Sequence, residues 1–150
     1  MASAQFIASG EPFSGQVALD LAVVDLTGTD VRDWLQGQVT QDLRTLVPGG
    51  SVQACLCKPT GQLLAHLDVW DLGGPLRLLV HRCELAAVLA RVEEAVIMED
   101  VEASIVPGTV IHVLGDVAGP PDDSRRMRSR TGLPGFDQIL PPGAGGGNRL

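Results

Sequence analysis

The chain has 150 residues, 45% of them hydrophobic, and its 11 basic and 18 acidic residues give a net charge of −7. This length and apolar content suffice for a domain with a hydrophobic core, whereas the acidic balance argues against a protein that holds nucleic acid along its whole surface. No apolar run is long enough to span a bilayer, and residues 1–15 lack the features of a signal peptide, so we expect a cytoplasmic protein.

Hydrophobic alternation predicts mostly strands. Residues 16–26 read as one strand, and Thr29 or Asp30 is expected to cap a short helix that runs to about Leu35. After a turn at 47–50, the pattern predicts strands over 51–57, 62–71 and 76–81, a helix over 84–96, and strands near 101–106 and 109–114. The loops at 58–61 and 72–75 are typical of hairpins, so the fold class is α+β, with antiparallel sheets and flanking helices.

The hairpin loop at 72–75 fixes a strand register. Leu67 should lie opposite Val80, Trp70 opposite Arg77, and His66 opposite His81. One face of the sheet is then apolar: Leu63, Ala65, Leu67, Val69, Leu76, Leu78 and Val80. The predicted helix offers a matching stripe of Leu85, Val88, Leu89 and Val92. We expect this helix to cover that face.

The opposite face is chemically mixed and allows two interpretations. It carries Cys55, Cys57, His66, Asp68, Trp70, Arg77 and His81. Either the face contacts another domain, a partner or a ligand, or it is an ordinary wet sheet face on which Trp70 and Arg77 stack. The spacing of Cys55 and Cys57 is not that of a zinc knuckle, so we expect no metal site and treat the cysteines as reduced, buried residues.

The remaining candidate residues form no recognisable chemical site. Arg125, Arg126, Arg128 and Arg130 form a basic cluster, which could contact RNA or an anionic ligand but is more simply a solvated loop. The serines lack the Gly-x-Ser-x-Gly context of a catalytic nucleophile. The glycines at 143–147 have no following helix that could help bind a phosphate, and residues 141–150 are expected to be a flexible tail.

Several motifs occur in a characteristic order: Leu26-Thr27-Gly28-Thr29-Asp30, then Leu35-Gln36-Gly37-Gln38-Val39-Thr40-Gln41-Asp42, then Gly49, Cys57-Lys58-Pro59-Thr60-Gly61, and Gly132-Leu133-Pro134-Gly135-Phe136-Asp137. Over residues 16–140 this order resembles the N-terminal part of the YgfZ-like folate-binding proteins, a branch of the glycine cleavage T-protein superfamily. The chain departs from the family pattern at Gln41 and Gln62. It also lacks the signature Lys-Gly-Cys-(Tyr/Phe)-x-Gly-Gln-Glu.

The resemblance implies a partial T-protein-like folate-binding fold. Residues 1–50 and 107–140 would form part of a first domain, and residues 51–106 an inserted antiparallel sheet domain with one covering helix. By the same comparison the chain looks incomplete, so we expect self-association or binding of a complementary C-terminal half.

For function, the resemblance implies a tetrahydrofolate-binding adaptor that supports iron-sulfur cluster assembly or repair and tRNA modification. The alternative is a tetrahydrofolate-dependent aminomethyltransferase, but the strand end at 78–84 lacks the Asn and Asp that the T-proteins use to polarise the amine. A truncated remnant without ligand activity is the third possibility. The protein is therefore more simply a binding protein than an enzyme, and no catalytic residue is assigned.

The predicted folate contacts are Gln36, Gly37, Gln38, Thr40 and Asp42. Amides and hydroxyls can pair with the donor and acceptor edge of a pterin without introducing charge. The alternative is that Gln38, Thr40 and Asp42 only cap or brace the turn before Pro48.

Overall fold

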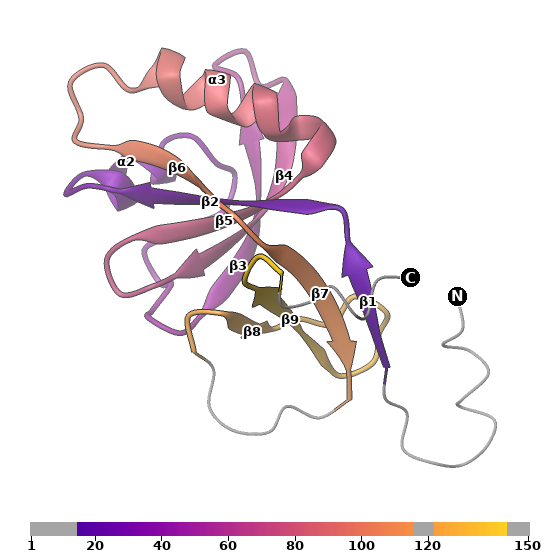
Figure 1. Ribbon diagram of the computed structural model, residues 1–150. Helices are drawn as coiled ribbons and strands as arrows, with labels where there is room; N and C mark the ends of the chain where they lie inside the picture. The colour runs from indigo at the N-terminus through magenta and orange to yellow at the C-terminus, as the bar shows by residue number, and fades with distance from the viewer. Residues whose placement is uncertain (1–14, 116–121, 144–150) are drawn as a thin grey trace. The chain divides into compact units, whose positions relative to one another are not determined.

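The computed structural model describes residues 15–115 and 122–143 (Figure 1). The chain divides into two compact units. The larger unit is Asp20–Pro107, and the smaller one combines the segments before and after it. Both are built on antiparallel sheets, which confirms the α+β fold class. Within the described residues, no helix combines the length and the apolar character needed to cross a bilayer.

The larger unit is a five-stranded antiparallel sheet in the order β3-β4-β5-β2-β6. Its elements in chain order are β2 (Leu21–Thr27), α2 (Val31–Gln36), β3 (Ser51–Cys57), β4 (Leu63–Asp71), β5 (Leu76–His81), a 3-10 turn η1 (Arg82–Glu84), α3 (Leu85–Ala95) and β6 (Glu102–Val106). The strands and helices predicted between residues 29 and 106 are all present, with their ends shifted by one or two residues.

Helix α3 lies across one face of this sheet (Figure 1) and covers its apolar side chains. Val88 and Val92 are buried, while Leu85 and Leu89 pack at the edge of the same core. Ala65, Leu67 and Val69 on β4 face this helix stripe together with residues of β2 and β5. Leu63 is the exception, since it is 58% exposed at the first position of β4. The predicted core face is otherwise confirmed.

The β4–β5 register is confirmed where the two strands pair: Leu67 lies opposite Val80, and Trp70 lies opposite Arg77. The ladder ends at Leu67, so the expected pairing of His66 with His81 is not formed. His66 lies opposite Cys55 on β3 instead, and His81 lies opposite Leu21 on β2.

Only part of the mixed face is buried. Trp70 is 1% exposed and Asp68 is buried as well, whereas Cys55, Cys57 and His66 are half-buried and His81 is exposed. Arg77 does not provide a solvated cation for stacking, because its Nε and Nη2 donate to the two carboxylate oxygens of Asp25 at 2.7 and 2.9 Å. The interpretation of this face as solvated was wrong at Asp68, Trp70 and Arg77, because β2 adds an acidic side chain beside Arg77 that the hairpin register alone could not reveal.

The strand predicted over 16–26 is two strands. β1 (Gly15–Leu19) pairs with β7 (Thr109–Leu114), whereas β2 pairs with β5 and β6. The chain changes sheets at Asp20. Apolar and other side chains alternate through Asp20 without interruption, so the sequence pattern does not indicate the break.

The smaller unit is a four-stranded sheet in the order β1-β7-β9-β8, completed by β8 (Arg125–Met127) and β9 (Gly135–Leu140). Neither of these two strands was predicted. Arg126 is buried, and its guanidinium donates to the backbone oxygens of Asp122 and Arg125. The interpretation of the arginine cluster as a solvated loop is therefore wrong, because β8 turns this side chain inward.

Asp137, the last residue of the Gly-x-Pro-Gly-x-Asp motif, is fully buried in the smaller unit. It accepts two hydrogen bonds from Arg130 Nε and one from Nη2, and it lies 2.8 Å from Nδ1 of His112. The motif thus supplies a buried carboxylate that is neutralised by neighbouring side chains.

Residues 20–50 were expected to belong with the first domain, but β2 and α2 lie within the larger unit. The reason is strand pairing: β2 forms hydrogen-bonded ladders with both β5 and β6. Of the expected tail at 141–150, residues 144–150 lie outside the described part of the chain.

Candidate functional site

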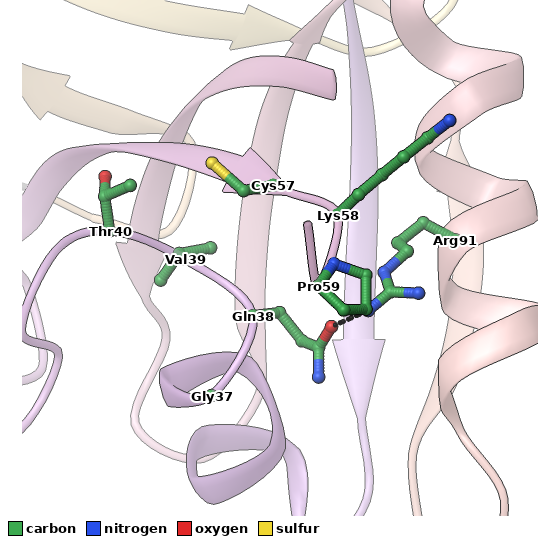
Figure 2. A pocket seen from close by; sticks show the side chains of 8 residues that line it. All are labelled: Gly37, Gln38, Val39, Thr40, Cys57, Lys58, Pro59 and Arg91. Carbon is green, nitrogen blue, oxygen red and sulfur yellow. Dashed lines mark hydrogen bonds between the residues drawn. The ribbon is translucent and has the colours of Figure 1, made fainter. Parts of the chain in front are cut away.

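A pocket of about 380 Å³ opens in the larger unit where the end of α2, the end of β3 and helix α3 meet. Figure 2 shows its lining side chains: Gly37, Gln38, Val39, Thr40, Cys57, Lys58, Pro59 and Arg91. The volume lies within the range of roughly 300–1,000 Å³ that is typical of small-molecule sites. The pocket is formed by three segments that are distant in sequence.

The first wall follows helix α2. Gly37 ends the helix, with its N–H bonded to Trp34 O at 3.1 Å. The chain then runs beside β3: Thr40 N donates to Cys55 O at 3.0 Å, and Cys55 N donates to Thr40 Oγ1 at 3.1 Å. Cys57 N donates to Gln38 O. These bonds fix the backbone of residues 38–40, so their side chains have defined directions.

The second wall is the tight turn after β3. Lys58 N donates to Gln62 O, and Gly61 N donates to Lys58 O, both at 2.8 Å. Gly61 has a φ of 89°, a conformation that glycine adopts without steric strain. Within the described residues, the ammonium group of Lys58 forms no salt bridge, and the side chain is exposed. The turn therefore presents a free cation at the mouth of the pocket.

Arg91 on α3 forms the third wall, and its side chain is only 10% exposed. Its Nη2 donates to Gln38 Oε1 at 2.9 Å, whereas its Nε is buried without a hydrogen-bond partner. Because a guanidinium can only donate, the amide oxygen of Gln38 must face Arg91. The Nε2 amide group of Gln38 is thereby left as a donor for a ligand.

The polar side chains of this pocket supply two cations and further hydrogen-bond donors. They are the ammonium group of Lys58, the guanidinium of Arg91, the Nε2 group of Gln38 and the hydroxyl hydrogen of Thr40, whose oxygen already accepts from Cys55. No carboxylate lines the pocket. In a chain of net charge −7, this is a local concentration of positive charge.

Three of the five predicted site residues, Gly37, Gln38 and Thr40, lie in the pocket lining. Gln36 does not, because its Oε1 accepts a hydrogen bond from Leu43 N at 2.6 Å and so braces the following turn. Asp42 also lies outside the lining and binds the side chain and the backbone N–H of Arg44. The hydrogen bonds from Arg44 lower the pKa of the Asp42 carboxyl.

Sequence reasoning missed Arg91 as a site residue and noted Lys58 and Pro59 only as part of a turn motif. Arg91 is the one basic residue of α3 and lies beside the apolar stripe, next to Val92. That position predicts a partly buried cation, but nothing in the sequence indicates that it reaches Gln38, which is 53 residues earlier.

No family model matches this chain, and none of the curated proteins matches it. Among solved structures it is similar to the crystal structure of the glycine cleavage system aminomethyltransferase T from Bartonella henselae, with a TM-score of 0.74 and 16% sequence identity. The similarity covers 85% of this chain and 42% of that one, so the chain spans less than half the length of this neighbour. The two proteins share a fold.

Proposed function

We propose that this chain binds a folate, and that the pocket between α2, β3 and α3 is part of the binding site. The observation that carries the proposal is the position of the pocket. It forms at the Gln-Gly-Gln-x-Thr segment, whose amide and hydroxyl groups we expect to contact folate, and it does so in a chain that shares a fold with an aminomethyltransferase T-protein.

The residues present suit such a ligand. Tetrahydrofolate combines a pterin that donates and accepts hydrogen bonds with a glutamyl tail that carries two carboxylates. Gln38 and Thr40 offer uncharged donors, and Lys58 and Arg91 offer cations. Gln36 and Asp42 contribute indirectly by holding the turn that follows α2.

We further propose that the chain acts as a binding protein in iron-sulfur cluster assembly or repair, and thereby in tRNA modification, and that it does not transfer a methylene group. The pocket lining contains no carboxylate that could polarise an amine. The end of β5 and the residues after it, 78–84, lack the Asn and Asp expected of the transferases.

Calorimetric titration with reduced tetrahydrofolate tests the binding. The wild-type chain should bind, and Gln38→Ala should weaken the affinity about three- to tenfold, as expected for the loss of one hydrogen bond. Gln62→Ala is the matched control, because Gln62 is an exposed amide in the adjoining turn and does not line the pocket. The absence of binding by the wild-type chain would refute the proposal.

Two assays separate the possible roles. Methylene transfer from aminomethyl-lipoyl protein to tetrahydrofolate should not be detected; a measurable rate would favour the transferase. In cells lacking their own family member, the chain supplied together with a segment bearing the Lys-Gly-Cys signature should restore a cluster-dependent tRNA thiolation enzyme, and Gln38→Ala should restore it less. If the chain binds folate but does not restore the thiolation enzyme, the proposed role in iron-sulfur cluster assembly would be refuted and the proposed folate binding would stand.

A further inference from the structure

The charged side chains of the pocket favour an anion. Lys58 and Arg91 are cations, and no carboxylate lines the pocket. Gln38 Nε2 adds an uncharged donor beside them, since the amide oxygen of Gln38 faces the guanidinium of Arg91. The pterin of a folate is uncharged, whereas its glutamyl tail carries carboxylates, which accept charge-assisted hydrogen bonds. The tail is therefore the better partner for these side chains.

We propose that this pocket binds the γ-glutamyl carboxylates of a folate and that the pterin lies outside it. This inference rests on the proposed folate-binding function and specifies which part of the ligand the pocket takes. It assigns Lys58 and Arg91 as the specificity-determining residues and gives Gln38 a role in orienting the ligand.

Burial and charge support different roles for the two cations. Arg91 lies deep in the wall, with its side chain only 10% exposed, so a carboxylate that enters the pocket would meet the guanidinium in a partly desolvated setting, where a charge-assisted hydrogen bond is stronger. Lys58 lies at the exposed turn, and Figure 2 shows its side chain on the same side of Pro59 as α3. A tail with several carboxylates could therefore contact Arg91 inside the pocket and Lys58 at its mouth.

Glu94 is the acidic side chain nearest to Arg91, with its Oε1 3.7 Å from Nη1. It is 75% exposed, and an exposed pair at this distance binds weakly. Glu94 thus lowers the positive potential of the pocket only in part, and Lys58 has no such partner within the described residues.

The test compares tetrahydrofolate with tetrahydropteroate by calorimetry on the full chain. Tetrahydropteroate has the same pterin and keeps one carboxylate, that of its benzoate, but lacks the two carboxylates of glutamate. The wild-type protein should bind tetrahydrofolate at least about tenfold more tightly than tetrahydropteroate, as expected when a charge-assisted hydrogen bond is lost. Lys58→Gln and Arg91→Gln should each reduce this ratio mainly by weakening tetrahydrofolate binding. Raising the salt concentration should also reduce the ratio, because the contribution of exposed Lys58 is screened.

Arg82→Gln is the matched control, since Arg82 is an exposed arginine that pairs with Asp20 outside the pocket, and the substitution removes the same charge. It should leave the ratio unchanged. If Arg91→Gln does not fold, Lys58→Gln on the exposed turn decides the question by itself.

The outcomes separate this inference from the function on which it rests. Equal affinity for both compounds would overturn the tail site but leave folate binding intact. The same conclusion would follow if the wild-type chain prefers tetrahydrofolate and neither Lys58→Gln nor Arg91→Gln reduces that preference. Binding of neither compound would overturn both proposals. A preference for tetrahydrofolate that both pocket variants lose and the control keeps would support both.

Discussion

The start of helix α2 is stabilised by a residue far along the chain and not by a cap of its own. Asp30 is the N-cap residue but makes no side-chain bond to the helix. Its Oδ2 accepts from Asp100 N at 2.7 Å, while Thr29 N and Oγ1 donate to Asp100 Oδ2 at 2.9 and 3.0 Å. Asp30 stands at the start of the helix as predicted, but the predicted side-chain cap is not formed, and both side chains join the helix to the segment before β6.

This junction depends on Gly28, which gives the first prediction. Its φ is 125°, and a Cβ at this position would collide with the backbone oxygen of Asp100. Gly28→Ala should therefore lower the free energy of unfolding by about 3 kcal/mol or more, since it adds a clash to the cost of an unfavourable backbone conformation. Urea denaturation measures the change.

Gly73→Ala is the control, because Gly73 also has a positive φ of 96° but open space around its Cβ position. Gly73→Ala should lower the free energy of unfolding by only about 1 kcal/mol, because it adds the unfavourable backbone conformation without a clash. Equal losses for the two variants would show that the contact with Asp100 does not matter.

At the scale of elements, the match between the α3 stripe and the apolar face of β4 and β5 organises the larger unit. Val88 and Val92 pack into the same cluster as Leu67 and Val80. Burying the two valines contributes on the order of 3–6 kcal/mol before the loss of chain entropy is subtracted, and the partly buried Leu85 and Leu89 add to this. Because Arg91 neighbours this stripe, the packing that holds α3 on the sheet also sets one wall of the pocket.

The second prediction compares adjacent residues on opposite faces of β4. Leu67→Asp would place a carboxylate in the fully buried core, where no cation is available among the cluster residues, and should destabilise by about 4 kcal/mol or more or prevent folding. His66→Ser, at a half-exposed position, should cost no more than about 1 kcal/mol. Thermal unfolding of both variants checks this, and similar shifts in Tm would contradict the assignment of faces.

At the scale of the whole molecule, the larger unit is one continuous segment. All members of its hydrophobic core cluster, and all residues that line the pocket, lie within Asp20–Pro107. Its five strands pair only with one another. A continuous segment with its own sheet and core has the basic properties of an independent folding unit.

We therefore predict that residues 20–107, expressed alone, fold cooperatively and retain the folate affinity of the full chain within about threefold, an energy difference of about 0.6 kcal/mol. Hydrogen exchange should show the strongest protection in β4 and β5, where the core is most buried. A fragment with a disordered NMR spectrum would show that the unit depends on the rest of the chain for stability.

The sequence by itself determined the elements of the larger unit after residue 29 and most of the hairpin register. It could do so because alternation along 51–81, the glycine turns and the stripe at 85–92 are local patterns, each readable within one or two elements. It also located three pocket residues, Gly37, Gln38 and Thr40, through a motif that is contiguous in the chain. Of the three residues in the turn-bracing alternative, Asp42 does brace the turn through Arg44, whereas Thr40 bonds to Cys55 and Gln38 to Arg91.

Tertiary structure decided what depends on pairing between distant segments. The strand breaks at Asp20 because β1 belongs to the four-stranded sheet and β2 to the five-stranded sheet. Arg126 is buried because β8 pairs with β9. The donor character of the pocket was decided in the same way. Arg91 donates to Gln38 Oε1 across 53 residues of sequence, so packing between α3 and the segment after α2 determined which way the Gln38 amide faces.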